Sequence, residues 1–215
     1  MLRIQSLLLM VLSVSLLVLT GCMEKHPAGS KEAGEVLFAA CVPCHAADGS
    51  GKAHLGAPRI AGLQDWYVKE QLHKFRDGRR GAHPDDAPGL RMRPMARALS
   101  GPQDVDAVAA YVATLPKAKP AATLTGGDPA KGAAAYTVCV ACHGAAGEGN
   151  ELLGSPSLTG ANDWYLKTQL HNFRSRIRGA ADGDIRGAQM APMAMTLADD
   201  QAILDVLAHI QSLGN

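Results

Sequence analysis

Two short motifs of the same pattern hold the residues of this chain that are best placed to do chemistry. Each has two cysteines separated by two residues and a histidine directly after the second cysteine: Cys41, Cys44 and His45, then Cys139, Cys142 and His143. This spacing is the attachment signal for a c-type haem, in which both thiols bond to the porphyrin and the imidazole ligates the iron. The motifs therefore predict two haem c groups bound covalently to one chain.

A cysteine pair at this spacing also occurs in redox-active disulfides and in halves of zinc sites. Neither alternative calls for a histidine directly after both pairs. The cysteine count favours haem attachment as well, since four of the five cysteines are in the motifs and the fifth, Cys22, ends an apolar leader. No cysteine pair is then left for a structural disulfide.

The two motifs belong to a longer repeat. An offset of 98 residues carries Cys41 onto Cys139 and continues without a gap to Leu99 and Leu197. The matched residues between these points include Pro58 and Pro156, Trp66-Tyr67 and Trp164-Tyr165, Phe75-Arg76 and Phe173-Arg174, and Met92 and Met190. The chain is therefore a tandem duplication of one domain, not of one motif.

This repeat sets the expected domain boundaries. We expect domain 1 at residues 31–115 and domain 2 at residues 128–215. Between them, residues 116–127 are rich in Pro, Ala and Gly and show no apolar periodicity, which is typical of a linker.

The first residues of the chain indicate a targeting segment. Arg3 precedes an apolar run at 7–19, which is shorter than the ~20 apolar residues of a membrane-spanning helix and typical of a secretory signal. The Leu-Thr-Gly-Cys sequence that ends at Cys22 resembles the bacterial lipobox, whose leader is cut before the cysteine and whose cysteine is acylated. The resemblance implies a signal peptide at 1–21, lipidation of Cys22 and a tether at 22–30. The alternative is an ordinary signal peptide with an incidental cysteine.

Export and acylation together predict where the protein resides. Acyl chains on Cys22 would hold the chain on a membrane, because each buried methylene contributes about 0.8 kcal/mol. We therefore expect a lipid-anchored protein on the periplasmic side of a bacterial membrane.

Each copy of the repeat reads as helices without strands. Helix-favouring sequence leads into both motifs, two later segments open on aspartate, and the last segment of each copy has apolar residues at helical spacing. The expected helices lie at residues 31–40, 65–75 and 105–115 in the first copy and at 129–138, 163–173 and 203–213 in the second. The predicted fold class is all-α, in two tandem domains.

With these motifs in place, the chain resembles a class I cytochrome c in duplicate, and specifically the dihaem cytochrome c4 family. The resemblance extends to Gly147–Asn150 after the second motif, to Pro58–Gly62 and Pro156–Gly160, and to Met92–Ser100. It implies two tandem class I cytochrome c domains and an electron carrier. It also implies that the carbonyls of Pro58 and Pro156 accept a hydrogen bond from the proximal imidazoles.

Each haem iron needs a second axial ligand, and a Met thioether would raise the reduction potential. Each copy offers two candidates, Met92 or Met95 and Met190 or Met193. The resemblance favours Met92 and Met190, because the ligand of such cytochromes stands seven residues before a leucine, here at 99 and 197. Met95 and Met193 are the fallback pair.

Two equivalent histidines, His73 and His171, offer bis-histidine ligation as a rival interpretation. They lie in the middle helix of each copy, which in this family packs beside the haem and not over its distal face. We expect them to have surface or hydrogen-bonding roles.

The chain has a formal net charge of +1, which argues against nucleic-acid binding. Irons with both axial positions filled would have no open site for a substrate, so we expect an electron carrier and not an enzyme. Its expected partners are a quinol-oxidising complex or dehydrogenase and a terminal oxidase or reductase. The alternatives are an electron-accepting subunit of a periplasmic dehydrogenase or reductase complex, and a dihaem peroxidase. A peroxidase would need one displaceable ligand, which the similarity of the two copies disfavours.

Overall fold

The computed structural model describes residues 26–213. The predicted signal peptide, Cys22 and the first part of the tether lie outside the described residues. The described part of the chain consists of helices and connecting segments, with two isolated β-bridges, Lys52–Ala57 and Asn150–Ser155. The all-α fold class is thus confirmed. None of the helices in this part is long and apolar enough to cross a membrane.

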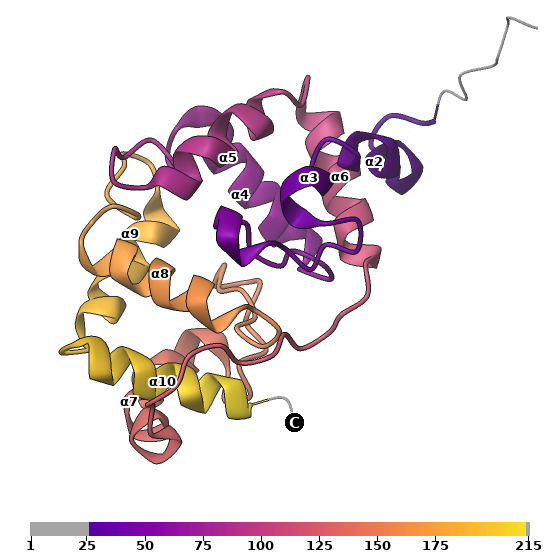
Figure 1. Ribbon diagram of the computed structural model, residues 1–215. Helices are drawn as coiled ribbons and strands as arrows, with labels where there is room; N and C mark the ends of the chain where they lie inside the picture. The colour runs from indigo at the N-terminus through magenta and orange to yellow at the C-terminus, as the bar shows by residue number, and fades with distance from the viewer. Residues whose placement is uncertain (1–25, 214–215) are drawn as a thin grey trace, which may run out of the picture.

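The helices form two sets, one for each copy of the repeat (Figure 1). Domain 1 has α2 (Lys31–Phe38), α3 (Val42–His45), the 3-10 helix η1 (Ala53–Leu55), α4 (Asp65–Asp77), α5 (Ala87–Arg97) and α6 (Pro102–Thr114). Domain 2 has α7 (Pro129–His143), α8 (Asp163–Arg174), α9 (Ile185–Met195) and α10 (Asp200–Ser212). The chain passes from α6 to α7 through an extended segment on the outside of both sets (Figure 1).

A glycine fixes the crossing of the first and last helices in each domain. α2 packs on α6, and α7 packs on α10. A Cβ atom at Gly34 would collide with the carbonyl oxygen of Ala107, and one at Gly132 would collide with that of Asp205. Because only glycine permits such a close approach of two backbones, the repeated glycine gives both domains the same crossing.

The apolar stripes predicted for the last helices form the centres of the two cores. Val105, Val108 and Val112 are buried in domain 1, and Ile203, Val206 and Ile210 are buried in domain 2. Burial of a side chain of this size contributes about 1.5–3 kcal/mol, so these stripes hold α6 and α10 in place.

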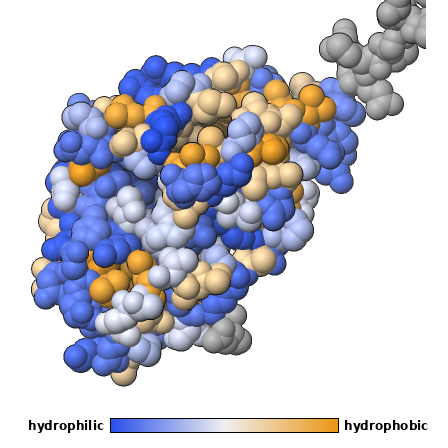
Figure 2. Space-filling model, in the orientation of Figure 1, coloured by the Kyte–Doolittle hydropathy of each residue, from blue (hydrophilic) through white to orange (hydrophobic). Residues whose placement is uncertain are grey.

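Polar side chains cover most of the face shown in Figure 2, with apolar patches over both domains. Large apolar side chains stay exposed at Leu55, Leu90 and Met95 in domain 1, and at Leu153 and Met193 in domain 2. Two pairs of these positions follow the repeat, since Leu55 matches Leu153 and Met95 matches Met193, whereas Leu90 matches Ala188. Both domains therefore expose apolar surface at equivalent places.

The segment that enters the haem motif differs between the domains. In domain 2, α7 runs without interruption into His143, whereas domain 1 ends α2 at Phe38 and begins α3 at Val42. Pro43 stands where domain 2 has Ala141, and proline has no N–H to bond the carbonyl four residues earlier. The turn between α2 and α3 is closed by hydrogen bonds between residues three positions apart, such as the Cys41 N–H to the Phe38 carbonyl at 2.8 Å.

Reciprocal contacts join the two domains. The backbone N–H of Arg59 donates to Asn162 Oδ1 at 2.7 Å, and that of Ser157 donates to Gln64 Oε1 at 3.4 Å. The repeat matches Arg59 with Ser157 and Gln64 with Asn162. Each domain therefore gives the other the same contact, as expected for a pseudo-twofold arrangement.

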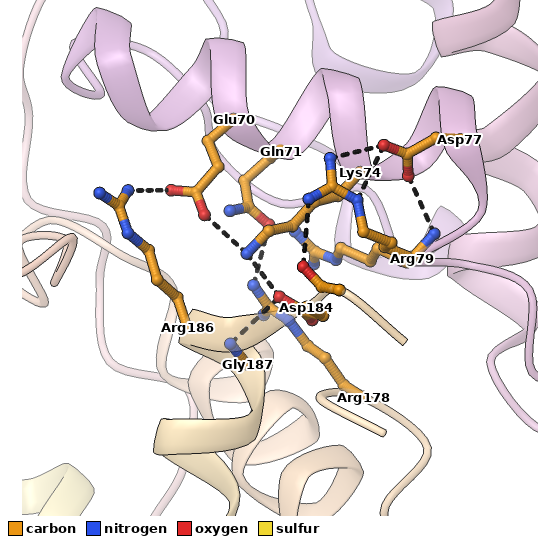
Figure 3. Close-up of polar contacts among 11 residues, drawn as sticks. Glu70, Gln71, Lys74, Asp77, Arg79, Arg178, Asp184, Arg186 and Gly187 are labelled. Carbon is orange, nitrogen blue, oxygen red and sulfur yellow. Dashed lines mark hydrogen bonds and ion pairs between the residues drawn. The ribbon is translucent and has the colours of Figure 1, made fainter. Parts of the chain in front are cut away.

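Ion pairs add a one-sided contact to this arrangement (Figure 3). Lys74 of α4 lies 2.7 Å from Asp184 and 2.6 Å from Glu70, and Arg186 of α9 lies 2.7 Å from Glu70. The corresponding residues on the other side of the interface are Asn172, Asp86, Thr168 and Pro88, which cannot form the same set. Within residues 26–213, the ion pairs between the domains thus lie on one side of the interface only.

A buried aspartate fastens the linker to domain 2. Asp163, which is 2% exposed, accepts hydrogen bonds from the backbone N–H groups of Thr123 and Leu124 and from the Thr123 hydroxyl. Burial alone would raise the pKa of Asp163, but the bonds from Leu124 and Thr123 outweigh it and lower the pKa. Part of the predicted linker is therefore held against the second domain.

Candidate haem sites

The proximal histidines have the same environment in both domains. His45 Nδ1 donates to the Pro58 carbonyl at 2.8 Å, and His143 Nδ1 donates to the Pro156 carbonyl at 2.8 Å. Both imidazoles are buried, and burial lowers their pKa although the hydrogen bond opposes it. A neutral imidazole with Nδ1–H bonded presents its Nε2 lone pair, which is the form that ligates iron.

No disulfide joins any of the four motif cysteines. Cys41 and Cys139 are half-buried, whereas Cys44 and Cys142 are exposed. Desolvation, followed by the neighbouring cysteine, raises the pKa of Cys41 and of Cys139. The cysteines of a pair are three residues apart on helical backbone and therefore lie on one face, which suits attachment to two positions of one porphyrin. Among the described residues, no group of three His, Cys, Asp or Glu side chains could hold a metal ion, so no zinc site is completed there.

The candidate methionines lie on α5 and α9. Met92 is half-buried and packs against the core of domain 1 that also contacts Cys41, while Met95 is exposed. In domain 2, Met190 is half-buried and Met193 is exposed. Burial thus separates the two candidates in the same way in both copies. The choice of Met92 and Met190 as ligands stays a prediction.

Both methionine helices are fixed at their N-termini by an aspartate. The Asp86 carboxylate accepts from the N–H of Gly89 at 3.0 Å, and that of Asp184 accepts from Gly187 at 3.1 Å. Such caps typically contribute about 1 kcal/mol. They hold the start of the helix that carries each candidate ligand.

An arginine from the middle helix holds the other end of each methionine helix. Arg76 donates to the carbonyls of Ala96 and Leu99, and Arg174 donates to the carbonyl of Ala198 at 3.1 Å. Arg76 and Arg174 are matched by the repeat, but the sequence predicted no role for them. An arginine follows a matched phenylalanine in both copies, and this repetition is the sequence signal that could have indicated a structural role.

The histidines considered for bis-histidine ligation lie on α4 and α8. His171 Nε2 is 3.6 Å from the carboxylate of Asp200 on α10, and the His171 side chain is 37% exposed. This contact at the surface agrees with the surface or hydrogen-bonding role predicted for His171.

A buried hydrogen-bond donor without a partner tests whether the residues around the motifs fit haem. The indole N–H of Trp66 is buried without a hydrogen-bond partner among the described residues. A buried N–H without a partner costs about 1–3 kcal/mol, and a haem propionate is an acceptor that would remove this cost. The exposed apolar side chains on both domains, such as Leu55 and Met95, fit a porphyrin in the same way, because it would cover apolar surface. The donor set, the orphaned indole and the exposed apolar residues therefore all fit haem c.

The helical fold and the paired sites define the chain as a tandem class I c-type cytochrome with two covalently bound haem c groups. A family model described as cytochrome c matches residues 31–116 and again residues 129–214. The chain belongs to the cytochrome c family and, within it, to the dihaem cytochromes c4.

Individual relatives agree with this assignment. The chain is 33% identical over 213 residues to cytochrome c4 of Pseudomonas aeruginosa, a match that covers 94% of this chain and 98% of that protein. It is 35% identical over 186 residues to the thiosulfate dehydrogenase electron acceptor of Stutzerimonas stutzeri, which covers 80% and 79% of the two chains. The crystal structure of reduced cytochrome c4 from Pseudomonas stutzeri matches with a TM-score of 0.65 and 29% identity, over 86% of this chain and 100% of the other. These relatives support an electron-carrying cytochrome.

Proposed function

We propose that this cytochrome is a lipid-anchored periplasmic carrier, which takes electrons from a quinol-oxidising complex or a dehydrogenase and delivers them to a terminal oxidase or reductase. In this proposal, His45 with Met92 and His143 with Met190 are the axial ligands of the two irons. The supporting observation is that both domains present the same buried imidazole, bonded through Nδ1 to a proline carbonyl, and the same half-buried methionine.

The residues of the chain have separate tasks at each haem. The cysteines anchor the porphyrin, and the Pro58 and Pro156 carbonyls orient the imidazoles and increase their basicity. The bound haem supplies the redox chemistry, since its iron alternates between the ferric and ferrous states. Met92 and Met190 would ligate the irons and would raise their potentials, which suits electron transfer and disfavours substrate binding.

The ferric spectrum of the holoprotein tests the ligand assignment. Ferric haem with a Met ligand has a weak red charge-transfer band, and we expect both haems to contribute to it. Met92→Ala or Met190→Ala should each remove about half of the band, whereas the neighbouring replacements Met95→Ala and Met193→Ala should leave it. Loss of the band in the Met95 or Met193 variants instead would reject the assignment. Rapid cyanide or peroxide binding by the unmodified ferric protein would reject the proposal that the protein is an electron carrier.

The lipid anchor needs a separate test, because Cys22 lies outside the described residues. Cells that express the protein can be labelled with palmitate and fractionated. We expect label on the membrane-bound cytochrome and its loss in Cys22→Ala, with the native protein labelled in parallel as the control. A soluble, unlabelled native protein would reject the tether.

A second candidate is the electron-accepting subunit of a thiosulfate dehydrogenase. The similarity to the Stutzerimonas stutzeri electron acceptor specifically favours it. Stopped-flow reduction of the ferric holoprotein by such a dehydrogenase and thiosulfate would discriminate. Reduction that is much faster than that of a monohaem cytochrome c at the same concentration would support this candidate, whereas equal rates would favour a general carrier.

A further inference from the structure

The residue after each motif histidine has the same backbone conformation in both domains but differs in type. Ala46 has φ 64° and ψ 161°, and Gly144 has φ 79° and ψ 158°. This conformation is open to glycine and essentially closed to residues with a Cβ atom. Domain 2 therefore adopts it without strain, whereas domain 1 stores strain directly beside His45.

The turn that follows each histidine is otherwise closed in the same way. In domain 1 the N–H of Gly51 donates to the His45 carbonyl at 2.9 Å, and in domain 2 the N–H of Gly149 donates to the His143 carbonyl at 2.8 Å. Because the two turns share this bond, the strain does not come from a different path of the chain. It comes from the methyl group of Ala46.

Domain 2 adds a side-chain hydrogen bond to this turn. Tyr136 of α7 is 2% exposed, and its hydroxyl donates to the Gly144 carbonyl at 2.9 Å. Burial raises the pKa of Tyr136 to about 12, so the hydroxyl keeps its proton and stays a donor. The repeat places Phe38 at this position of domain 1, and a phenyl ring has no polar hydrogen to donate. A buried side chain therefore clamps the turn after His143, and its counterpart beside His45 cannot.

A third matched position differs in the same turn. A Cβ atom at Gly144 would lie 2.1–2.4 Å from the carboxylate of Glu148, which accepts from the N–H of Ala146 at 2.9 Å. Domain 1 has the shorter Ser50 at the Glu148 position. The turn of domain 2 is therefore built around glycine, whereas that of domain 1 has changed together with Ala46.

Ala46 is joined directly to His45, so its strain bears on the bond between that histidine and iron. A ligated imidazole is held both by the iron and by the Pro58 carbonyl, which fixes the peptide next to it. If the bond to iron opens, this peptide can turn and the strain is relieved. Opening relieves no such strain at Gly144. Strain of one residue in this conformation typically changes an equilibrium constant by about tenfold or more.

We propose that Ala46 and Tyr136 are positioning residues that make the two histidine–iron bonds unequal. When a strong diatomic ligand such as nitric oxide binds the opposite face of a ferrous iron, the His45 bond opens and the His143 bond stays closed. The imidazole leaves with its lone pair and the iron stays ferrous, so the step needs no oxidant or reductant. Haem 1 is then the ligand-responsive site of the carrier.

The inference rests on His45 and His143 as the axial ligands of the proposed function. It does not depend on the lipid anchor, the methionine ligands or the redox partners.

Electron paramagnetic resonance of the ferrous holoprotein under excess nitric oxide tests the proposal. Nitric oxide weakens the bond across the iron, and splitting by a second nitrogen shows that the histidine is still bound. We expect about half of the haem in the native protein to lose this splitting. Ala46→Gly removes the strain and should lower the constant for opening at haem 1 by about tenfold or more. The control Ala47→Gly alters an exposed residue without a positive φ and should change the constant by less than about threefold.

Reciprocal variants test the other domain. Tyr136→Phe removes the clamp and should raise the constant for opening at haem 2 by roughly fivefold. Gly144→Ala adds the strain of domain 1 and should raise it by about tenfold. Ala46→Gly combined with Phe38→Tyr gives domain 1 both residues of domain 2, and both histidines should then stay bound. Circular dichroism and haem content confirm that each variant is folded and loaded.

Three outcomes would overturn the proposal. One is an equal response of both haems in the native protein, and another is a native spectrum in Ala46→Gly. In these two cases the second-nitrogen splitting can still identify the histidine ligands, so the proposed function stands. The third is the absence of that splitting from every variant, which would reject the histidine ligands and this inference together.

Discussion

The two domains share a sequence repeat and a fold, yet they differ where they connect to the rest of the molecule. Domain 1 breaks its first helix between Phe38 and Val42, just before Pro43, whereas domain 2 runs one helix from Pro129 to His143. Domain 1 contributes the buried Lys74, whereas its counterpart in domain 2 is the neutral Asn172. The contact of the motif histidine with a proline carbonyl is the same in both copies, and the connections are not. Duplicated domains can thus keep a common site while each acquires its own role in assembly.

The one-sided ion pair should be the most costly difference to remove. Lys74→Asn gives domain 1 the residue of domain 2 and leaves Asp184, which is 2% exposed, without its lysine. Loss of one partner of a buried pair typically costs 3–5 kcal/mol, and we expect a decrease of about this size in the free energy of unfolding of the holoprotein. Urea unfolding followed by circular dichroism measures it.

Two variants control this measurement. Lys74→Asn combined with Asp184→Asn should recover most of the loss, because no unpaired charge remains. Lys69→Asn removes a half-buried lysine paired with the exposed Asp65 and with Asp106, and should cost less than about 1 kcal/mol. An equal cost for Lys69→Asn and Lys74→Asn would contradict the importance of the buried pair.

The helix break can be transferred between domains. Ala141→Pro puts the proline of domain 1 into the continuous helix α7, and we expect a cost of about 3 kcal/mol because an interior proline removes a hydrogen bond and clashes with the preceding turn. Pro43→Ala should change the free energy of unfolding by less than about 1 kcal/mol, since hydrogen bonds between residues three positions apart already close the turn between α2 and α3. Thermal unfolding of both variants measures the difference, and similar values would mean that α7 tolerates the break.

Asp163 and its counterpart Asp65 give a pH-dependent comparison. Asp163→Asn removes charged hydrogen bonds to the linker and should cost about 2 kcal/mol at neutral pH, whereas the exposed Asp65→Asn should cost less than about 1 kcal/mol. Because folding lowers the pKa of Asp163, its stabilisation is present above the unfolded pKa of about 3.9 and is lost as the pH falls through the folded pKa. The native protein and Asp163→Asn should therefore converge in stability below about pH 4 in acid titrations of urea unfolding. A difference that persists at pH 2 would exclude this ionisation as the cause.

Much of the fold follows from the sequence because the repeat and the helical periodicity are local signals. The cysteine motifs predicted the cofactor, and the stripes at Val105 and Ile203 predicted the buried faces of the last helices. The contact of the Pro58 carbonyl with His45 came from the family resemblance, and the structure has this geometry. These features depend on short stretches of chain, which the sequence displays directly.

Contacts between the domains were not predicted, since they depend on how two folded units pack. Arg80 and Arg178 had no predicted role, yet both are buried at the interface. The buried Lys74 was also missed, although the mismatch with Asn172 in the repeat was a visible sign. The break at Pro43 could have been found in the same way, because proline replaces alanine at that position.

The contacts of Arg59 and Ser157 bear on whether either domain would be complete if it were expressed alone. Each follows the proline whose carbonyl binds the proximal histidine, and each donates its backbone N–H to the opposite domain. The loop behind each imidazole is thus completed by the neighbouring domain. A single domain expressed alone would retain its haem motif but would lose one support of its proximal loop, so the two halves are modular in sequence and interdependent in structure.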